Sequence, residues 1–216
     1  MRALLPGTVR RMKCTGGGMS GSILYIHGFN SAPSSKKACQ LIAVMAQIGL
    51  GERLRVPALH HHPRQAMAQL EAAIAELESP LLVGSSLGGY YATHLAERYS
   101  ARAVLINPAI RPYDDLKPYR GTQVNMYSGE TFEVSEAHFD ELRKLEVARI
   151  TRPGRYLLLA ETDDEVLDYR QAVAFYGGAW QFVQGGGDHS YQGFIAQIPV
   201  ILRFAAAAVA GGAFAT

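Results

Sequence analysis

A serine lies between two glycines at the point where an apolar run gives way to a segment of helical character. The stretch "GSSLG", residues 84–88, follows "LLV" and fits G-x-S-x-G with Ser86 at its centre. In a nucleophile elbow, a sharp strand-to-helix turn exposes the serine hydroxyl, and the glycines let the backbone pass closely. The simpler interpretation is a flexible turn whose serine caps a helix. A nucleophilic role for Ser86 therefore requires partners elsewhere in the chain.

Several acids follow a later apolar run, in "RYLLLAETDDEVLDYRQA". These are Glu161, Asp163, Asp164, Glu165 and Asp168. Asp164 is favoured over Asp163 as the triad acid. We expect the apolar residues two and three positions later, Val166 and Leu167, to dock on the core and turn the Asp164 carboxylate inward. Asp168 is predicted to cap the next helix, which is a structural role.

A histidine follows three glycines after the last apolar run, in "AWQFVQGGGDHSYQGF". The glycines allow this loop to bend back over the sheet and bring His189 toward Ser86. Serine, acid and histidine thus occur in the order in which one kind of hydrolase triad is arranged along its chain. The alternative is a surface histidine in a flexible loop. We predict the triad Ser86, Asp164 and His189.

Backbone amides are expected to stabilise the oxyanion that a serine attack creates. One donor is the N–H of Leu87, directly after the predicted nucleophile. The second is predicted to be the N–H of Phe29, because Gly28 in "YIHGFNSAPSS" permits the required twist. We interpret His27 as a residue that fixes this loop, since His189 already fills the role of general base.

Other motifs are weaker. The stretch "HHHPR" from His60 has the composition of a metal site, but adjacent histidines are expected to point in different directions, with no acid or cysteine at ligand spacing. A surface loop or helix start is favoured, and His138 is interpreted as a helix residue. The glycines lack the patterns of phosphate-binding loops. We expect neither a cofactor nor a metal.

Short apolar runs alternate with helical segments, which predicts βαβ units and a parallel sheet. The predicted strands are "SILYI", "RLRVP", "PLLVGS", "RAVLIN", "RYLLLA" and "AWQFVQ". Helical segments are expected over Ser35–Ile48, from Pro63 to Leu77, after Ser86 and over Gly193–Phe204. The predicted fold is α/β, with a doubly wound, mainly parallel six-stranded sheet and helices on both faces.

One segment interrupts this alternation. Residues 108–152 contain few apolar runs but carry the aromatic residues Tyr113, Tyr119, Tyr127 and Phe132. We predict a lid-like insertion over the site, with irregular surface as the alternative. The aromatic side chains favour an apolar acyl site.

The chain of 216 residues is 48% hydrophobic and has a formal net charge of +2. This predicts a single domain over residues 21–207 and no nucleic-acid partner. Residues 1–20 are expected to be a disordered extension, with the start at Met1 or Met19 left open, and 208–216 a flexible tail. Cys14 and Cys39 lie in unlike surroundings, so no disulfide framework is predicted. The absence of a signal-like or membrane-spanning run favours a cytoplasmic protein.

The chain resembles the α/β-hydrolase superfamily, and closely the small bacterial esterases of the YqiA-like family. The resemblance covers residues 22–204 and rests on "LYIHGFNSAPSSKKA", "LVGSSLGGYYATHLAERY", "INPAIRPYDDL", "YSGETF", "DDEVLDYRQAVAFY" and "GGGDHSYQGF". It implies the triad Ser86, Asp164 and His189. Two departures from the family pattern, Asp163 before the acid and Asp188 before the histidine, place a carboxylate beside each triad partner.

The predicted activity is that of a serine esterase acting on small carboxylic esters or thioesters through an acyl-enzyme. Fold and triad do not fix the substrate, so acyl transfer and C–C bond hydrolysis remain alternatives. A binding protein that keeps the fold without turnover is the alternative outside enzymes. The oligomeric state is left open.

Overall fold

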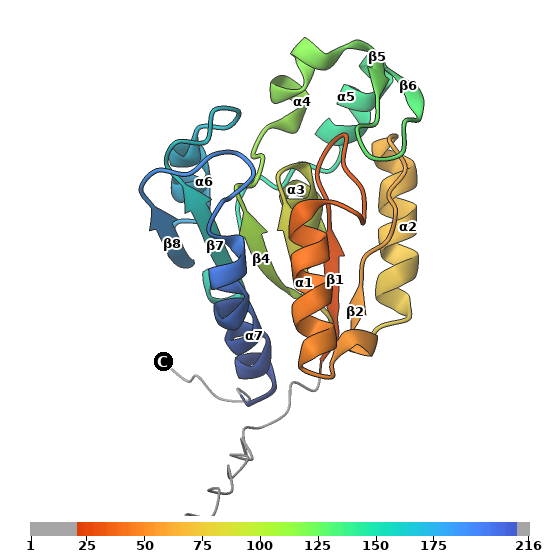
Figure 1. The fold of residues 1–216 in the computed structure, drawn as a ribbon. Helices are drawn as coiled ribbons and strands as arrows, with labels where there is room; N and C mark the ends of the chain where they lie inside the picture. The colour runs from red at the N-terminus through yellow and green to blue at the C-terminus, as the bar shows by residue number, and fades with distance from the viewer. Residues whose placement is uncertain (1–20, 211–216) are drawn as a thin grey trace, which may run out of the picture.

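The computed structural model describes residues 21–210 and consists of a parallel sheet between two layers of helices (Figure 1). The sheet has six strands in the order β2-β1-β3-β4-β7-β8, and each neighbouring pair is parallel. The strands are β1 (Ile23–Ile26), β2 (Leu54–Arg55), β3 (Leu81–Ser85), β4 (Arg102–Ile106), β7 (Tyr156–Glu161) and β8 (Trp180–Gln184). All six predicted strands are therefore found, and the predicted fold class is confirmed.

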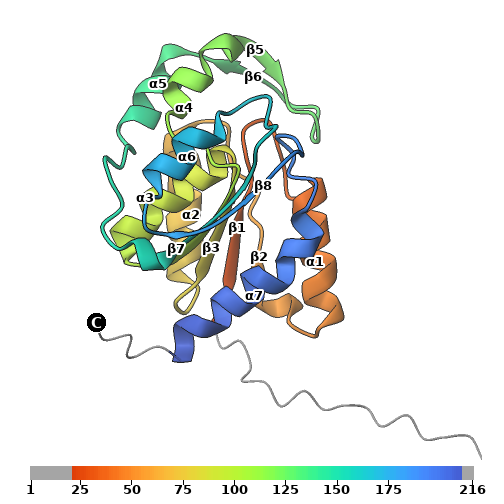
Figure 2. The ribbon, with the colours of Figure 1, turned by 90° about the vertical axis from the view of Figure 1, so that its left-hand side faces the viewer.

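Five helices cover the two faces of the sheet. On one face lie α1 (Lys36–Gln47) and α7 (Phe194–Ala210), and on the other lie α2 (Pro63–Ala75), α3 (Leu87–Tyr99) and α6 (Tyr169–Phe175) (Figure 2). Cys39 is a free, exposed thiol on α1. Within residues 21–210, no helix has both the length and the apolar character needed to cross a membrane.

The central strands are buried on both sides, as expected for a parallel sheet covered by helices. Along β1, Ile23 and Tyr25 pack toward α1 and α7, whereas Leu24 and Ile26 pack toward α2 and α3. Strand β3 is buried at every residue. This two-sided burial explains why the strands read as continuous apolar runs.

The segment between β4 and β7 is more ordered than its sequence indicates. It contains α4 (Pro112–Asp115), an antiparallel hairpin of β5 (Gly121–Val124) and β6 (Thr131–Val134), and α5 (Glu136–Arg143). Single-turn helices of the 3-10 type occupy Gly51–Arg53, Lys117–Tyr119 and Pro153–Arg155. Figures 1 and 2 show α4, α5 and the hairpin above the carboxyl ends of the central strands.

Irregular surface is thus the wrong description of residues 108–152, because Phe132 and Val134 of β6 and Phe139 of α5 are buried in the core. Whether this insertion moves as a lid stays a prediction. Residues 1–20 and 211–216, predicted as an extension and part of a tail, lie outside the described residues, as does Cys14.

Candidate active site

Ser86 occupies a strained turn between β3 and α3. Its backbone has φ 54° and ψ −122°, in a region that L-residues rarely adopt. The turn is closely packed, because a Cβ on Gly84 would overlap the backbone of Gly88, and one on Gly88 would overlap the Ile26 carbonyl. Such strain at a serine directly after a central strand is the geometry of a nucleophile elbow.

His189 lies within hydrogen-bond distance of Ser86. Its Nε2 atom is 3.1 Å from Ser86 Oγ, and its Nδ1 atom is 2.9 Å and 3.0 Å from the two Asp164 carboxylate oxygens. The Asp164 side chain is 2% exposed and that of His189 24% exposed. The three residues predicted from the sequence are therefore brought together in one hydrogen-bonded chain.

The Asp164 carboxylate is held by the backbone that follows it. Its Oδ1 atom accepts hydrogen bonds from the N–H groups of Val166 at 2.9 Å and Leu167 at 2.8 Å. The expectation that Val166 docks on the core is wrong, since it is 47% exposed, and Leu167 is half-buried. A tight turn of backbone donors, rather than apolar anchoring, directs the carboxylate inward. Asp168 caps α6 as predicted, accepting from the Arg170 N–H.

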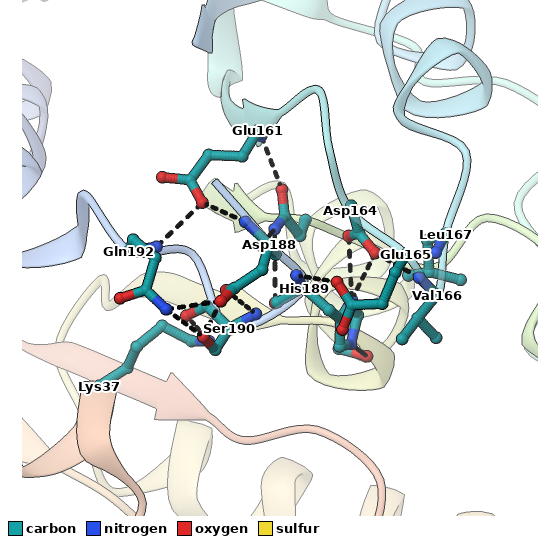
Figure 3. Close-up of polar contacts among 12 residues, drawn as sticks. Lys37, Glu161, Asp164, Glu165, Val166, Leu167, Asp188, His189, Ser190 and Gln192 are labelled. Carbon is teal, nitrogen blue, oxygen red and sulfur yellow. Dashed lines mark hydrogen bonds and ion pairs between the residues drawn. The ribbon is translucent and has the colours of Figure 1, made fainter. Parts of the chain in front are cut away.

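The two acids that depart from the family pattern do not contact the imidazole. Asp163 accepts from the Thr162 hydroxyl at 3.0 Å. Asp188 accepts from the backbone N–H and hydroxyl of Ser190 and from the side chain of Gln192 (Figure 3). The Ser190 hydrogen bonds hold the pKa of the Asp188 carboxyl below its usual value. Of these three acids, Asp164 is therefore the one that contacts Nδ1 of His189.

The loop carrying His189 is fixed by a residue to which the sequence analysis gave no role. Glu161 ends β7, is fully buried, and accepts hydrogen bonds from the backbone N–H groups of Asp188 and Gln192 (Figure 3). It also accepts one from the N–H of Gly193. Asn107, after β4, donates to the Asp188 carbonyl and accepts from the Glu161 N–H. The available signal in the sequence was an acid at the end of an apolar run, followed 24 residues later by the first of three glycines.

The loop after β1 lies against the serine. A Cβ on Gly28 would meet Ser86 Cβ at 3.1 Å, so the Gly28–Phe29 backbone passes directly beside the elbow. Neither the Phe29 N–H nor the Leu87 N–H takes part in a hydrogen bond within residues 21–210. Leu87 is the first residue of α3, where an N–H has no partner inside the helix. Both predicted donors are thus free beside Ser86, and their oxyanion role stays a prediction.

His27 fixes this loop, as expected. Its Nδ1 atom lies 3.1 Å from the Gly28 carbonyl, and its Nε2 atom accepts from the Leu59 N–H at 3.2 Å. Burial lowers the pKa of His27, which keeps the imidazole neutral and suited to these contacts.

A small hollow of about 40 Å³ opens beside the elbow. Its walls include Gly28, Phe29, Leu59, His61, Tyr91 and Phe132. Of the aromatic residues predicted to form an acyl site, Phe132 lines the hollow and also packs edge-on against Phe29. A larger hollow of about 590 Å³ lies at the amino ends of the strands, near Leu81 and Arg102. It is at the end of β3 opposite Ser86 and therefore lies away from the predicted triad.

Comparisons with known proteins agree with this fold. Residues 22–206 match the family described as "Uncharacterised protein family (UPF0227)". The UPF0227 protein YcfP of Escherichia coli (strain K12 / DH10B) is 29% identical over 103 residues, which are 44% of this chain and 54% of YcfP. The matched stretch thus spans about half the length of this curated relative.

Solved structures also resemble the chain. A putative hydrolase from Agrobacterium vitis S4 aligns with a TM-score of 0.68 at 21% identity over 86% of this chain and 87% of that one. Mouse alpha/beta hydrolase domain-containing protein 10 gives 0.64 at 16%, covering 84% and 88%. A monoacylglycerol lipase from Paleococcus ferrophilus gives 0.64 at 18%, covering 89% and 96%. The chain therefore has the α/β-hydrolase fold.

Proposed function

The chain belongs to the uncharacterised protein family UPF0227, and we propose that it is a serine hydrolase that cleaves carboxylic ester or thioester bonds of small acyl substrates. The observation that carries the proposal is the chain of hydrogen bonds from Ser86 through His189 to Asp164. The strained elbow at Ser86 supports it independently. One of the structural relatives is a monoacylglycerol lipase, which is compatible with this reaction class.

The proposed reaction begins with the Ser86 hydroxyl. His189 Nε2 removes its proton as Oγ attacks the substrate carbonyl, while Asp164 holds the imidazole through Nδ1 and stabilises the cation that forms. The N–H groups of Leu87 and Phe29 are the proposed donors to the negative oxygen of the tetrahedral intermediate. Protonated His189 then donates its proton to the leaving alcohol or thiol.

The second half of the reaction reverses these roles. An acyl group remains bonded to Ser86 Oγ, and His189 activates a water molecule that attacks the acyl carbonyl. The ester bond to Ser86 breaks, the carboxylic acid leaves, and the serine recovers its proton. The hollow of about 40 Å³ beside the elbow fits a short acyl group better than a long one.

The deciding experiment is intact-mass analysis of the full chain after treatment with a fluorophosphonate, followed by peptide mapping. We expect one stoichiometric adduct on Ser86. Ser86→Ala should lose the adduct and reduce turnover of short-chain esters about a millionfold. Ser85→Ala is the matched control, since Ser85 is the buried last residue of β3, and it should keep most of the activity.

Two results would overturn the proposal. Folded protein without any adduct would favour a binding protein that retains the fold. Equal activity of the Ser85 and Ser86 variants would place the nucleophile elsewhere. Product analysis with several acyl donors separates hydrolysis from acyl transfer and C–C bond cleavage, because only hydrolysis of an ester releases the free acid and alcohol without a second acceptor.

A further inference from the structure

Three histidines from two distant parts of the chain meet beside the hollow. His61 and His62 precede α2, and His138 lies on α5, 76 residues further along than His62. One ring nitrogen from each histidine lies within 4.8 Å of the others. The expectation that adjacent histidines diverge is wrong, because the rings of His61 and His62 lie 4.7 Å apart and that of His138 lies 4.0 Å from His62.

We propose that His61, His62 and His138 form a binding site for a single divalent zinc-like cation, which links the insertion to the body of the protein. His61 Nδ1 lies 3.4 Å from His138 Nε2. Two imidazole nitrogens bound to one tetrahedral Zn²⁺ at the usual distance are separated by about 3.3 Å. The distance between these two nitrogens is therefore close to that between two ligands of one Zn²⁺.

An acid accompanies the histidines. Glu141, one turn after His138 on α5, has a carboxylate oxygen 3.8 Å from His62 Nδ1, and its side chain is 17% exposed. It also accepts a hydrogen bond from the Arg64 N–H at 3.0 Å, which fixes it at the start of α2. A carboxylate in this position balances part of the charge of a bound cation. Glu141 is not one of the three converging residues, so the three histidines are the proposed ligands.

The three imidazoles differ in exposure. His138 is buried, so its ring is held in place on α5. His61 and His62 are partly exposed, so their rings can rotate toward a common centre.

Binding requires one change of tautomer. His138 Nδ1 accepts a hydrogen bond from the Ser135 N–H at 3.2 Å, which places the ring proton on Nε2, facing His61. A cation at Nε2 requires that proton to move to Nδ1. The new Nδ1–H group can donate a hydrogen bond to the Ser135 hydroxyl, which is 3.3 Å away. No proton is lost overall. Because this exchange opposes binding, a cation with strong affinity for imidazole is favoured over Mg²⁺.

His60 provides a matched control within the same run of histidines. Its Nδ1 atom accepts from the His62 N–H at 3.0 Å, and its own backbone N–H donates to Gln69. It is not among the three converging residues. A variant at His60 therefore tests whether cation binding depends on the three converging histidines or only on the number of histidines in this segment.

The test uses the untagged full chain, treated with a chelator and then freed of it, and titrated with ZnCl₂ by calorimetry. We expect one equivalent of Zn²⁺ to bind and Mg²⁺ not to bind. His61→Asn and His62→Asn should each weaken binding about a hundredfold or more. His60→Asn should leave the affinity within about twofold. These positions are partly exposed, so the result does not depend on a variant at buried His138.

Hydrogen exchange in the same samples locates the site. Added Zn²⁺ should slow exchange in α5 and in the first turn of α2, because the cation joins the two. Absence of stoichiometric Zn²⁺ binding would overturn the proposal, as would equal losses at His60 and His61 or unchanged exchange in α5. None of these readouts depends on hydrolytic activity.

Discussion

Glu161 accepts a hydrogen bond from the backbone N–H of Asp188 at 3.1 Å, so a buried carboxylate holds the residue directly before His189. It also accepts from the N–H groups of Gln192 at 2.9 Å and Gly193 at 3.0 Å. Hydrogen bonds to an ionised acceptor are stronger than those between neutral groups. The position of His189 therefore depends on an acid that does not contact its ring.

Glu161→Gln should disturb this loop, because the new amide directs an N–H group toward backbone donors. We expect the free energy of unfolding to fall by about 2 kcal/mol, and turnover to fall with little change in KM. Urea unfolding and ester kinetics measure the two effects. Glu165→Gln is the control. Glu165 is exposed and accepts only one backbone hydrogen bond among the described residues, from the N–H of His189. Equal losses in both variants would contradict a special role for Glu161.

Asp164→Asn should leave the fold intact and impair catalysis. An amide can take the place of the carboxylate, but it favours the wrong imidazole tautomer and does not stabilise the cation, so turnover should fall about ten-thousandfold. Asp163→Asn should retain nearly full activity, because Asp163 bonds to Thr162 rather than to the imidazole. Steady-state kinetics on one short-chain ester compares them. A larger loss at Asp163 would reverse the assignment of the acid.

Phe132→Ala should enlarge the hollow beside Ser86. Phe132 is 8% exposed and forms part of the hollow wall. Each methylene accommodated in an apolar site changes kcat/KM by about tenfold or more, so the variant should shift preference toward longer acyl chains. Tyr127→Ala serves as the control, because Tyr127 is 48% exposed in the hairpin turn. An unchanged ratio of long-chain to short-chain kcat/KM in Phe132→Ala would exclude this wall from acyl binding.

The lowered pKa of Lys37 should make the free energy of unfolding depend on pH. Burial lowers the pKa of Lys37 to about 8, although Asp188, Asp164 and Glu161 act in the opposite direction. Between about pH 8 and 10, the unfolded chain keeps a lysine proton that the folded chain has lost. The unfolded state then binds more protons, and the free energy of unfolding rises with pH by at most about 1.4 kcal/mol per unit.

Lys37→Met should flatten this rise, because methionine does not titrate. Urea unfolding at about pH 7.5, 8.5 and 9.5 provides the comparison, below the range where most tyrosines ionise. The two proteins should have parallel profiles below about pH 8 and diverge above it. Parallel profiles across the whole range would show that Lys37 keeps an ordinary pKa in the folded state.

The central strands β1, β3, β4 and β7 were predictable because they are buried and form continuous apolar runs, whereas β8 is exposed at every residue. The same pattern failed in the insertion, where β5 is exposed or half-buried at every residue and β6 alternates. The sequence of such a two-stranded hairpin has no continuous apolar run by which its strands could be recognised. Its order depends on contacts with distant residues, such as that of the Asn125 side chain with the Ser31 carbonyl.

The members of the predicted triad were readable because each follows a strand and carries a distinctive side chain. The supporting contacts were not readable, since they join residues far apart in the sequence. Glu161 was one of five acids in a short stretch, and its partners are backbone groups. His138 could not be linked to His61 because the fold alone brings α5 to the start of α2.

Trp180 is the single tryptophan of the chain, and it lies 66% exposed on β8, the last strand of the sheet. Its indole is already largely hydrated in the native state, so intrinsic fluorescence should respond weakly to unfolding. Because the indole is exposed, its emission should also change when another protein surface covers the free edge of β8. A blue shift in emission with rising protein concentration would therefore reveal self-association along that strand.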